Sequence, residues 1–261
     1  MVIYIFDGSF WGLLTAIFES FARKEYEVKL TEESRFEASF FDTSVRIHTE
    51  REKANRVWLG LQKKVGTEGQ QQFYKAFLSE QPAVFKSLFT YAQYVFCNPA
   101  GFAENYGNAD VLAIAQAAQK VHREKHRMEA FVRFKKHRNG LFMAVVAPDF
   151  NVLPLICPHF KDRYADQPWL IYDERRKYGI YYNGSTVCEV VLASKPRALT
   201  EHDVLEAGLD GHEQLYATLW NDYFRSTNIA ERKNKKLHLQ HVPRRYWRYL
   251  TEKTDDLGLG L

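Results

Sequence analysis

The sequence predicts an α+β fold with a helical N-terminal part, a central and mainly antiparallel sheet, and a helical, basic C-terminal part. Apolar residues recur at helical spacing in the first half. Runs rich in Val, Ile, Tyr and Phe fill residues 130–192, and helical spacing returns from Thr200. With 261 residues, 46% hydrophobic and 15% aromatic, the chain can bury a large core. We expect parts at 1–128, 129–195 and 196–261 that pack as one compact unit.

The first half opens with a predicted strand at Val2–Phe6, then an Asp7-Gly8 corner and a helix that Ser9 caps. This helix repeats apolar residues three or four positions apart: Phe10, Leu13, Leu14, Ile17, Phe18 and Phe21. Four more helices are predicted by the same periodicity, over 50–64, 67–79, 82–96 and 108–126.

The central part is predicted to form a mainly antiparallel sheet with two hairpins at Asn139-Gly140 and Asn183-Gly184, because Asn and Gly tolerate the positive φ of tight hairpin turns. A short helix is expected over 153–164. The predicted strands cover 130–137, 141–147, 168–173, 177–182 and 186–192.

The last part is predicted to be helical from Thr200, with an apolar stripe that includes Leu215, Leu219 and Tyr223. Pro243 then opens a short turn that carries Tyr246 and Trp247.

Two basic blocks concentrate the positive charge of the chain. Residues 120–138 and 221–250 each hold eight Lys or Arg residues against two acidic ones, a net charge of +6 apiece. The whole chain carries only +4, so the remainder carries −8. This asymmetry, with aromatic residues interleaved, favours a nucleic acid as the partner. The candidate nucleic-acid-binding residues are Arg127, Arg133, Arg232, Lys235, Lys236, His238, His241, Arg244, Arg245, Tyr246 and Trp247. Solvated helix or strand faces are the simpler interpretation of such charge runs.

Catalytic chemistry is harder to place, and the catalytic residues are unknown at this level. Asp7 at a strand end, His159 after a proline, and Asp173 at another strand end are weak candidates, since spacing alone cannot show whether they meet. His122 and His126 have the spacing of metal ligands on a helix, but the zincin motif needs Glu directly after the first His. We therefore expect neither a metal nor a cofactor.

Cys97, Cys157 and Cys188 lie far apart without C-x-x-C spacing, so we expect buried thiols. No run approaches the roughly 18 apolar residues that a membrane span needs. The N-terminus lacks a basic leader. We expect a soluble cytoplasmic protein without a membrane partner.

Four blocks of the chain resemble a bacterial family of probable DNA metabolism or DNA repair proteins, a domain of otherwise unknown function. They lie at 4–19 (YIFDGSFWGLLTAIFE), 124–134 (EKHRMEAFVRF), 152–182 and 226–252. The family is usually paired with a radical SAM protein of DNA modification or repair, and some members are fused to a uracil-DNA glycosylase-like domain. The resemblance implies DNA as ligand and a radical SAM protein as partner, and it supplies no catalytic residue.

Three functions therefore stay open at the level of sequence. The first is a DNA-binding protein that assists DNA modification or repair with a radical SAM partner. The second is an enzyme that acts on a nucleotide or damaged base through Asp7, His159 and Asp173. The third is a protein-interaction module without nucleic acid.

Overall fold

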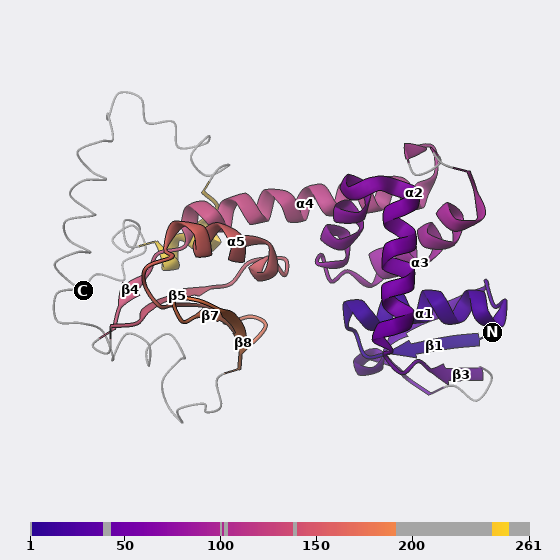
Figure 1. Cartoon of the computed structure of the whole chain (residues 1–261), viewed down its shortest axis with the longest axis horizontal. Coiled ribbons are helices and arrows are strands. Elements are labelled where there is room, and N and C mark those ends of the chain that lie inside the picture. Colours follow the sequence, from indigo (N-terminus) through magenta and orange to yellow (C-terminus); the bar gives the residue numbers. More distant parts are fainter. Residues whose placement is uncertain are drawn as a thin grey trace. The chain divides into compact units, whose positions relative to one another are not determined.

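A computed structural model describes residues 2–38, 43–99, 101, 104–137, 140–191 and 242–250. It contains helices and two sheets, which confirms a mixed α and β fold. The chain divides into two compact units, Met1–His122 and Arg123–Leu261 (Figure 1).

The first unit is built on a three-stranded parallel sheet in the order β2-β1-β3. Its strands are β1 (Val2–Phe6), β2 (Val28–Glu32) and β3 (Thr43–Arg46). Strand β1 was predicted, whereas β2 and β3 were not. Parallel neighbours need a crossover, and the helix that follows β1 provides it for β2.

Helices supply most of the core of the first unit. Helix α1 (Phe10–Arg23) begins at Ser9, whose hydroxyl accepts a hydrogen bond from the backbone N–H of Gly12 (2.9 Å). Helices α2 (Arg51–Phe77) and α3 (Pro82–Cys97) pack against α1 and against each other. Leu13, Leu61 and Leu88, one from each helix, are fully buried.

Helix α2 is interrupted at Gly66, which has φ 71° and ψ 179°. The two helices predicted at 50–64 and 67–79 therefore correspond to the two arms of a kinked helix. Helix α4 (Ala109–Phe131) starts in the first unit and ends in the second.

The second unit contains a five-stranded sheet in the order β4-β5-β6-β7-β8, and four of its predicted strands are close to the observed bounds. The exception is β4, where a strand was expected from residue 130, because α4 continues to Phe131. The strands are β4 (Lys135–Lys136), β5 (Phe142–Val146), β6 (Trp169–Asp173), β7 (Tyr178–Tyr182) and β8 (Val187–Val190).

Three of the four strand pairs are antiparallel, which confirms a mostly antiparallel sheet. Strands β5 and β6 are parallel because helix α5 (Leu153–Arg163) forms the crossover between them. Val146 pairs with Asp173, so the carboxyl ends of these two strands lie next to each other.

The turn between β7 and β8 is closed by a backbone hydrogen bond from Asn183 to Thr186 (3.2 Å). Gly184 adopts φ +97°, and the Asn183 side chain accepts the backbone N–H of Ser185 (2.9 Å) and of Thr186 (2.8 Å). Asn139, in the other expected corner, lies outside the described residues.

The described chain ends with the 3-10 helix η4 (Arg244–Tyr249), which follows Pro243 and contacts β5. The helical pattern predicted from Thr200 lies outside the described residues.

Candidate functional site

A buried carboxylate, Glu124, lies on the inward face of α4, where it is 1% exposed. Its Oε1 accepts hydrogen bonds from the Tyr246 hydroxyl and from the backbone N–H of Asp149 (2.8 Å). Its Oε2 accepts one from Nη1 of Arg127 (3.3 Å). Helix α4, the loop after β5 and η4 thus meet at one ionisable group. Burial of such a group requires these donors.

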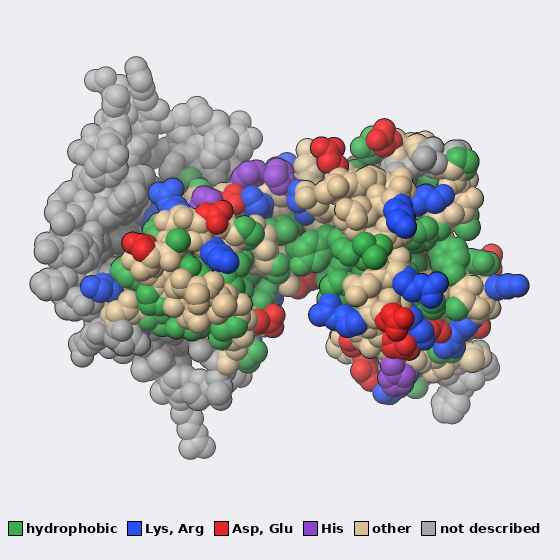
Figure 2. Space-filling view, in the orientation of Figure 1, with side chains coloured by type: hydrophobic (Ala, Val, Ile, Leu, Met, Phe, Trp, Pro, Cys, Tyr) green, Lys and Arg blue, Asp and Glu red, His purple; other side chains and the backbone are tan. Residues whose placement is uncertain are grey.

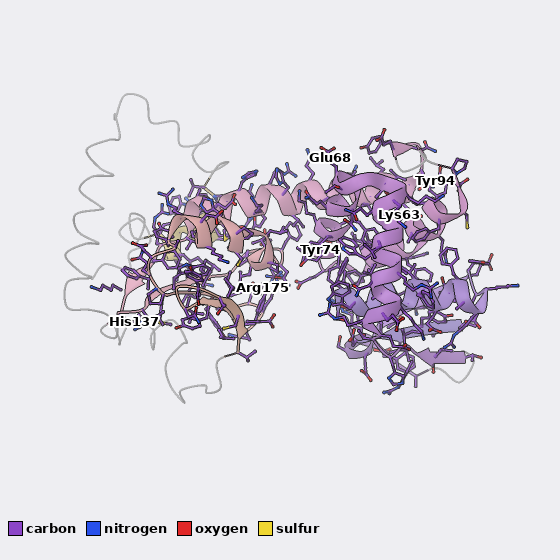
Figure 3. The ribbon with its side chains drawn as sticks, viewed as in Figure 1. Lys63, Glu68, Tyr74, Tyr94, His137 and Arg175 are labelled. Carbon is purple, nitrogen blue, oxygen red and sulfur yellow. The ribbon has the colours of Figure 1, made fainter. Side chains whose placement is uncertain are left out.

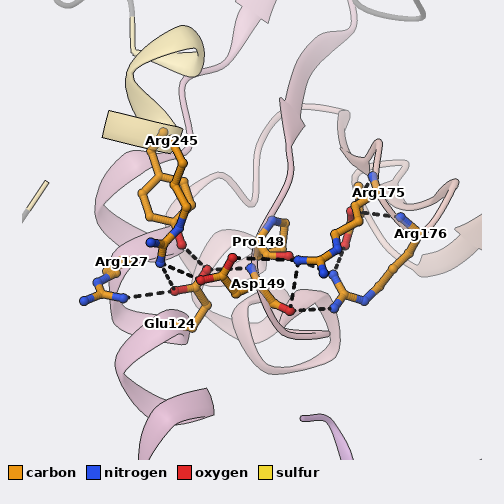
Figure 4. Close-up of polar contacts among 9 residues, drawn as sticks. Glu124, Arg127, Pro148, Asp149, Arg175, Arg176 and Arg245 are labelled. Carbon is orange, nitrogen blue, oxygen red and sulfur yellow. Dashed lines mark hydrogen bonds and ion pairs between the residues drawn. The ribbon is translucent and has the colours of Figure 1, made fainter. Parts of the chain in front are cut away.

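Asp149 follows β5 and links two arginines from distant parts of the second unit (Figure 4). Its Oδ2 lies 2.6 Å from Nη2 of Arg245, and its Oδ1 lies 3.7 Å from Nη1 of Arg175. Nη2 of Arg245 is also 3.9 Å from Oε2 of Glu124. Both basic blocks therefore contribute an arginine to Glu124, Arg127 from the first block and Arg245 from the second.

Asp173 is fully buried at the carboxyl end of β6. Its Oδ1 accepts the backbone N–H groups of Arg175 (2.9 Å) and Arg176 (3.1 Å), and its Oδ2 accepts Nη1 of Arg176 (2.8 Å). Burial raises the pKa of the Asp173 carboxyl, although Arg176 and these hydrogen bonds act to lower it. The contacts close the β6–β7 turn.

Arg176 connects this turn to the loop after β5. Its guanidinium donates to the backbone carbonyls of Pro148 (3.0 Å) and Asp149 (3.2 Å). We call Arg127, Arg175, Arg176 and Arg245 the arginine cluster. Four guanidinium groups face three carboxylates, Glu124, Asp149 and Asp173, which leaves one positive charge in excess.

The 3-10 helix η4 is held by contacts on both sides of the cluster. The Tyr246 ring lies 5.6 Å from the Phe131 ring, and the Arg245 guanidinium lies 4.6 Å from the Tyr246 ring. Burial and the bond to Glu124 raise the pKa of the Tyr246 hydroxyl, so it stays protonated at neutral pH and donates. Arg248 forms an ion pair with Glu174, which also accepts the Tyr249 hydroxyl (2.8 Å).

Of the predicted nucleic-acid-binding residues, the structure brings together Arg127, Arg245 and Tyr246. Arg244 lies over the Trp247 ring at 5.7 Å. Arg133 donates to the backbone carbonyl of Ala130 (2.6 Å). The other five, Arg232, Lys235, Lys236, His238 and His241, lie outside the described residues.

The sequence reasoning did not select Glu124, Asp149 or the two arginines of the β6–β7 turn as binding residues. One signal for Glu124 was available, because it shares a helix face with Val121 and Met128, which are both buried. A charged residue in an apolar stripe indicates a buried polar partner. Asp149 gives no such signal, since its partners are distant in sequence.

Asp7 lies in the first unit, between β1 and α1. Its Oδ1 accepts the backbone N–H of Ser9 (2.9 Å), and its Oδ2 accepts the Thr49 hydroxyl (2.7 Å). A Cβ on Gly12 would lie 2.2 Å from Asp7 Oδ1, so the carboxylate occupies space that only glycine leaves open.

His159, in the second unit, is half-buried with its ring 5.0 Å from the Phe160 ring. Whether Asp7, His159 and Asp173 act together stays a prediction, because Asp7 belongs to the other unit.

The expectation of buried cysteines is wrong. Cys97 ends α3 and is exposed, Cys188 is exposed on the outermost strand β8, and Cys157 is half-buried. Among the described residues, no group of three or more His, Cys, Asp or Glu side chains is arranged to hold a metal ion. In the same part of the chain, no helix combines the length and apolarity of a membrane span.

Comparison with known proteins places the chain in a family. No curated protein matches it. A model of a domain of unknown function, DUF4130, matches residues 82–252, which include α3, α4, the five-stranded sheet and η4. This match covers more than half of the chain, so the protein belongs to the DUF4130 family.

Proposed function

We propose that this chain is a DNA-binding protein that assists DNA modification or repair together with a radical SAM enzyme. One observation carries the DNA-binding part of the proposal. Arg127 of the first basic block and Arg245 of the second both lie beside Glu124, so the two blocks contribute to one surface of the second unit. If the two blocks were unrelated solvated faces, their arginines would not be expected to contact the same buried carboxylate.

Arginine is suited to this role because its planar guanidinium binds phosphate oxygens through two parallel hydrogen bonds. The charge balance of the surface is a weaker argument. In the view of Figure 2, described Lys and Arg side chains are interspersed with acidic ones instead of forming a uniform positive patch. Binding would therefore depend on where the arginines point as well as on total charge.

The partner enzyme is proposed from the sequence resemblance, whose family is usually paired with a radical SAM protein. We propose that the present chain supplies contact with DNA, while the radical chemistry belongs to the partner.

The test is fluorescence anisotropy of the purified protein with single-stranded, duplex and uracil-containing DNA across a salt series. We expect log affinity to fall linearly with log salt, with a slope of about −0.9 per neutralised phosphate on duplex. Arg123→Glu in the first block and Arg244→Glu in the second, both exposed, should weaken binding. Lys235→Glu combined with Lys236→Glu should do the same.

The matched control is Lys86→Glu, the same charge change at an exposed lysine of α3 outside both blocks. An equal loss in the control would mean that only net charge matters. Wild-type protein that fails to bind every DNA at low salt would refute the DNA-binding proposal.

A protein-docking function is the second candidate, and a specific observation favours it. Several cations of the basic blocks are already paired within the unit: Lys125 lies 2.6 Å from Glu129, and Arg248 pairs with Glu174. Paired cations are less available to a polyanion. Co-purification with the radical SAM protein at high salt, without DNA binding, would support this function instead.

A further inference from the structure

The arginine cluster contains two kinds of arginine. Arg176 is only 11% exposed, and its terminal nitrogens donate to Asp173 and to the carbonyls of Pro148 and Asp149. Its contacts join the β6–β7 turn to the loop after β5, which is a structural role.

The other three arginines lie at the surface. The side chains of Arg127, Arg245 and Arg175 are 31%, 44% and 59% exposed. Their ion pairs engage one terminal nitrogen of each guanidinium: Nη1 of Arg127, Nη2 of Arg245 and Nη1 of Arg175. A guanidinium has five N–H donors, so each retains donors that these ion pairs do not use.

The carboxylates behind these arginines fix where the guanidinium groups lie. Figure 4 shows the order Arg127, Glu124, Asp149 and Arg175 across the site, with Arg245 above the two carboxylates. Arg175 is also labelled in Figure 3, on the turn between β6 and β7. Because Glu124 is buried and accepts the backbone N–H of Asp149, the two carboxylates are themselves held in place.

We infer that Arg127, Arg175 and Arg245 form a phosphate clamp that binds the phosphodiester backbone of DNA, with Asp149 and Glu124 as positioning residues. The inference rests on the proposed DNA-binding function and specifies the chemistry of its contact. Long side chains normally lose conformational entropy on binding, and here the carboxylates restrict them beforehand. Arginine–phosphate contacts fix the position of a protein on DNA and carry no base information.

The decisive variant is Asp149→Asn, which keeps the size of the side chain and removes one negative charge beside Arg175 and Arg245. If only Coulomb attraction mattered, losing this charge would strengthen binding to DNA. The clamp predicts binding about 2- to 10-fold weaker, because the arginines must be ordered at the moment of binding. Asp162→Asn, an exposed carboxylate on α5 of the same unit, is the matched control and should bind no more weakly than wild type.

Arg175→Ala tests the donors themselves at an exposed position where folding should be unaffected. On duplex DNA, this variant should reduce the magnitude of the slope of log affinity against log salt by about 0.9. The reduction should be the same for every DNA sequence. Arg175→Lys should keep the slope but bind more weakly, since Lys lacks the planar fork. Circular dichroism of each variant checks that it folds.

A second arm uses inorganic phosphate as the probe and follows the Nε–Hε signals of the arginines by ¹⁵N NMR. Signals of Arg127, Arg175 and Arg245 should shift more than that of Arg176. If Arg175→Ala left DNA affinity at the wild-type value, or if Asp149→Asn raised it, the clamp would be refuted and the proposed function would still stand. Phosphate shifts without any DNA binding would refute the proposed function and, with it, the DNA clamp, and would leave the three arginines as a site for phosphate alone. Neither shifts nor DNA binding would refute both the site and the function.

Discussion

The hydroxyl of Tyr246 donates a hydrogen bond to the carboxylate of Glu124, a residue 122 positions earlier in the chain. Glu124 lies in the first basic block and Tyr246 in the second, so this bond joins the two segments whose composition first suggested a nucleic-acid partner. Both groups are buried. The C-terminal turn η4 thereby supplies one of the donors that stabilise the charge inside the second unit.

Tyr246→Phe should therefore destabilise the second unit. The substitution removes a hydrogen bond to a charged group, and such bonds contribute about 1.5–3 kcal/mol. The free energy of unfolding should fall by that amount in urea titrations. Tyr26→Phe is the control. Tyr26 is 48% exposed, so the loss of its hydroxyl should change the free energy of unfolding by less than about 0.5 kcal/mol. Equal stability of the two variants would show that the Tyr246–Glu124 bond contributes nothing.

Gly12→Ala should destabilise the first unit, although alanine favours helices. The new Cβ would lie 2.2 Å from Asp7 Oδ1 and 3.0 Å from Thr49 Oγ1, and overpacking of this kind costs about 1–3 kcal/mol. Without the Asp7 carboxylate, the effect of Gly12→Ala on the free energy of unfolding should change from destabilising to stabilising. In an Asp7→Ala background, Gly12→Ala should gain up to about 1 kcal/mol from helix propensity. A double-mutant cycle by thermal unfolding measures this, and additive effects would contradict the proposed clash.

The ionisation of Asp7 should contribute to acid stability. Burial acts to raise the pKa of the Asp7 carboxyl, but hydrogen bonds from Ser9 and Thr49 outweigh it and hold the pKa below 3.8. A carboxyl whose pKa is lower in the folded state stabilises the fold above pH 3.8, and this stability is lost as the pH falls through the folded pKa. Thr49→Val should raise the pKa of Asp7, which a ¹³C NMR titration measures. The loss of unfolding free energy caused by this variant should be larger near neutral pH than at acid pH. An unchanged pKa would refute the role of Thr49.

The second unit shows how far periodicity and turn residues predict structure. The strand expected at 168–173 forms at Trp169–Asp173, and the helix expected at 153–164 forms at Leu153–Arg163. In both elements apolar residues are buried, so the sequence pattern and the burial in the fold indicate the same helix or strand. Strands β2 and β3 were missed because they are at most half-buried, so their sequences lack a continuous apolar run.

The site was less predictable than the fold, for a physical reason. Charge composition selected Arg127 and Arg245, but the orientation of Arg245 depends on ion pairs with Asp149 and Glu124, which lie more than 90 residues earlier in the chain. Ion pairs of this range leave no local spacing signal. Arg175 was visible only as a charge next to a strand end, and its relation to Asp149 required the parallel pairing of β5 and β6.

Gly66 offers a last test of how sequence specifies the first unit. It adopts φ 71° and ψ 179°, a conformation that is essentially confined to glycine, at the kink between the two arms of α2. Gly66→Ala should cost about 1–3 kcal/mol through backbone strain alone, because no atom lies within 4 Å of the added Cβ. Gln62→Ala, at an exposed position four residues earlier, should change stability by less than about 0.5 kcal/mol. If urea unfolding showed Gly66→Ala to be neutral or stabilising, the kink would not be required, and α2 would be able to run straight through this position.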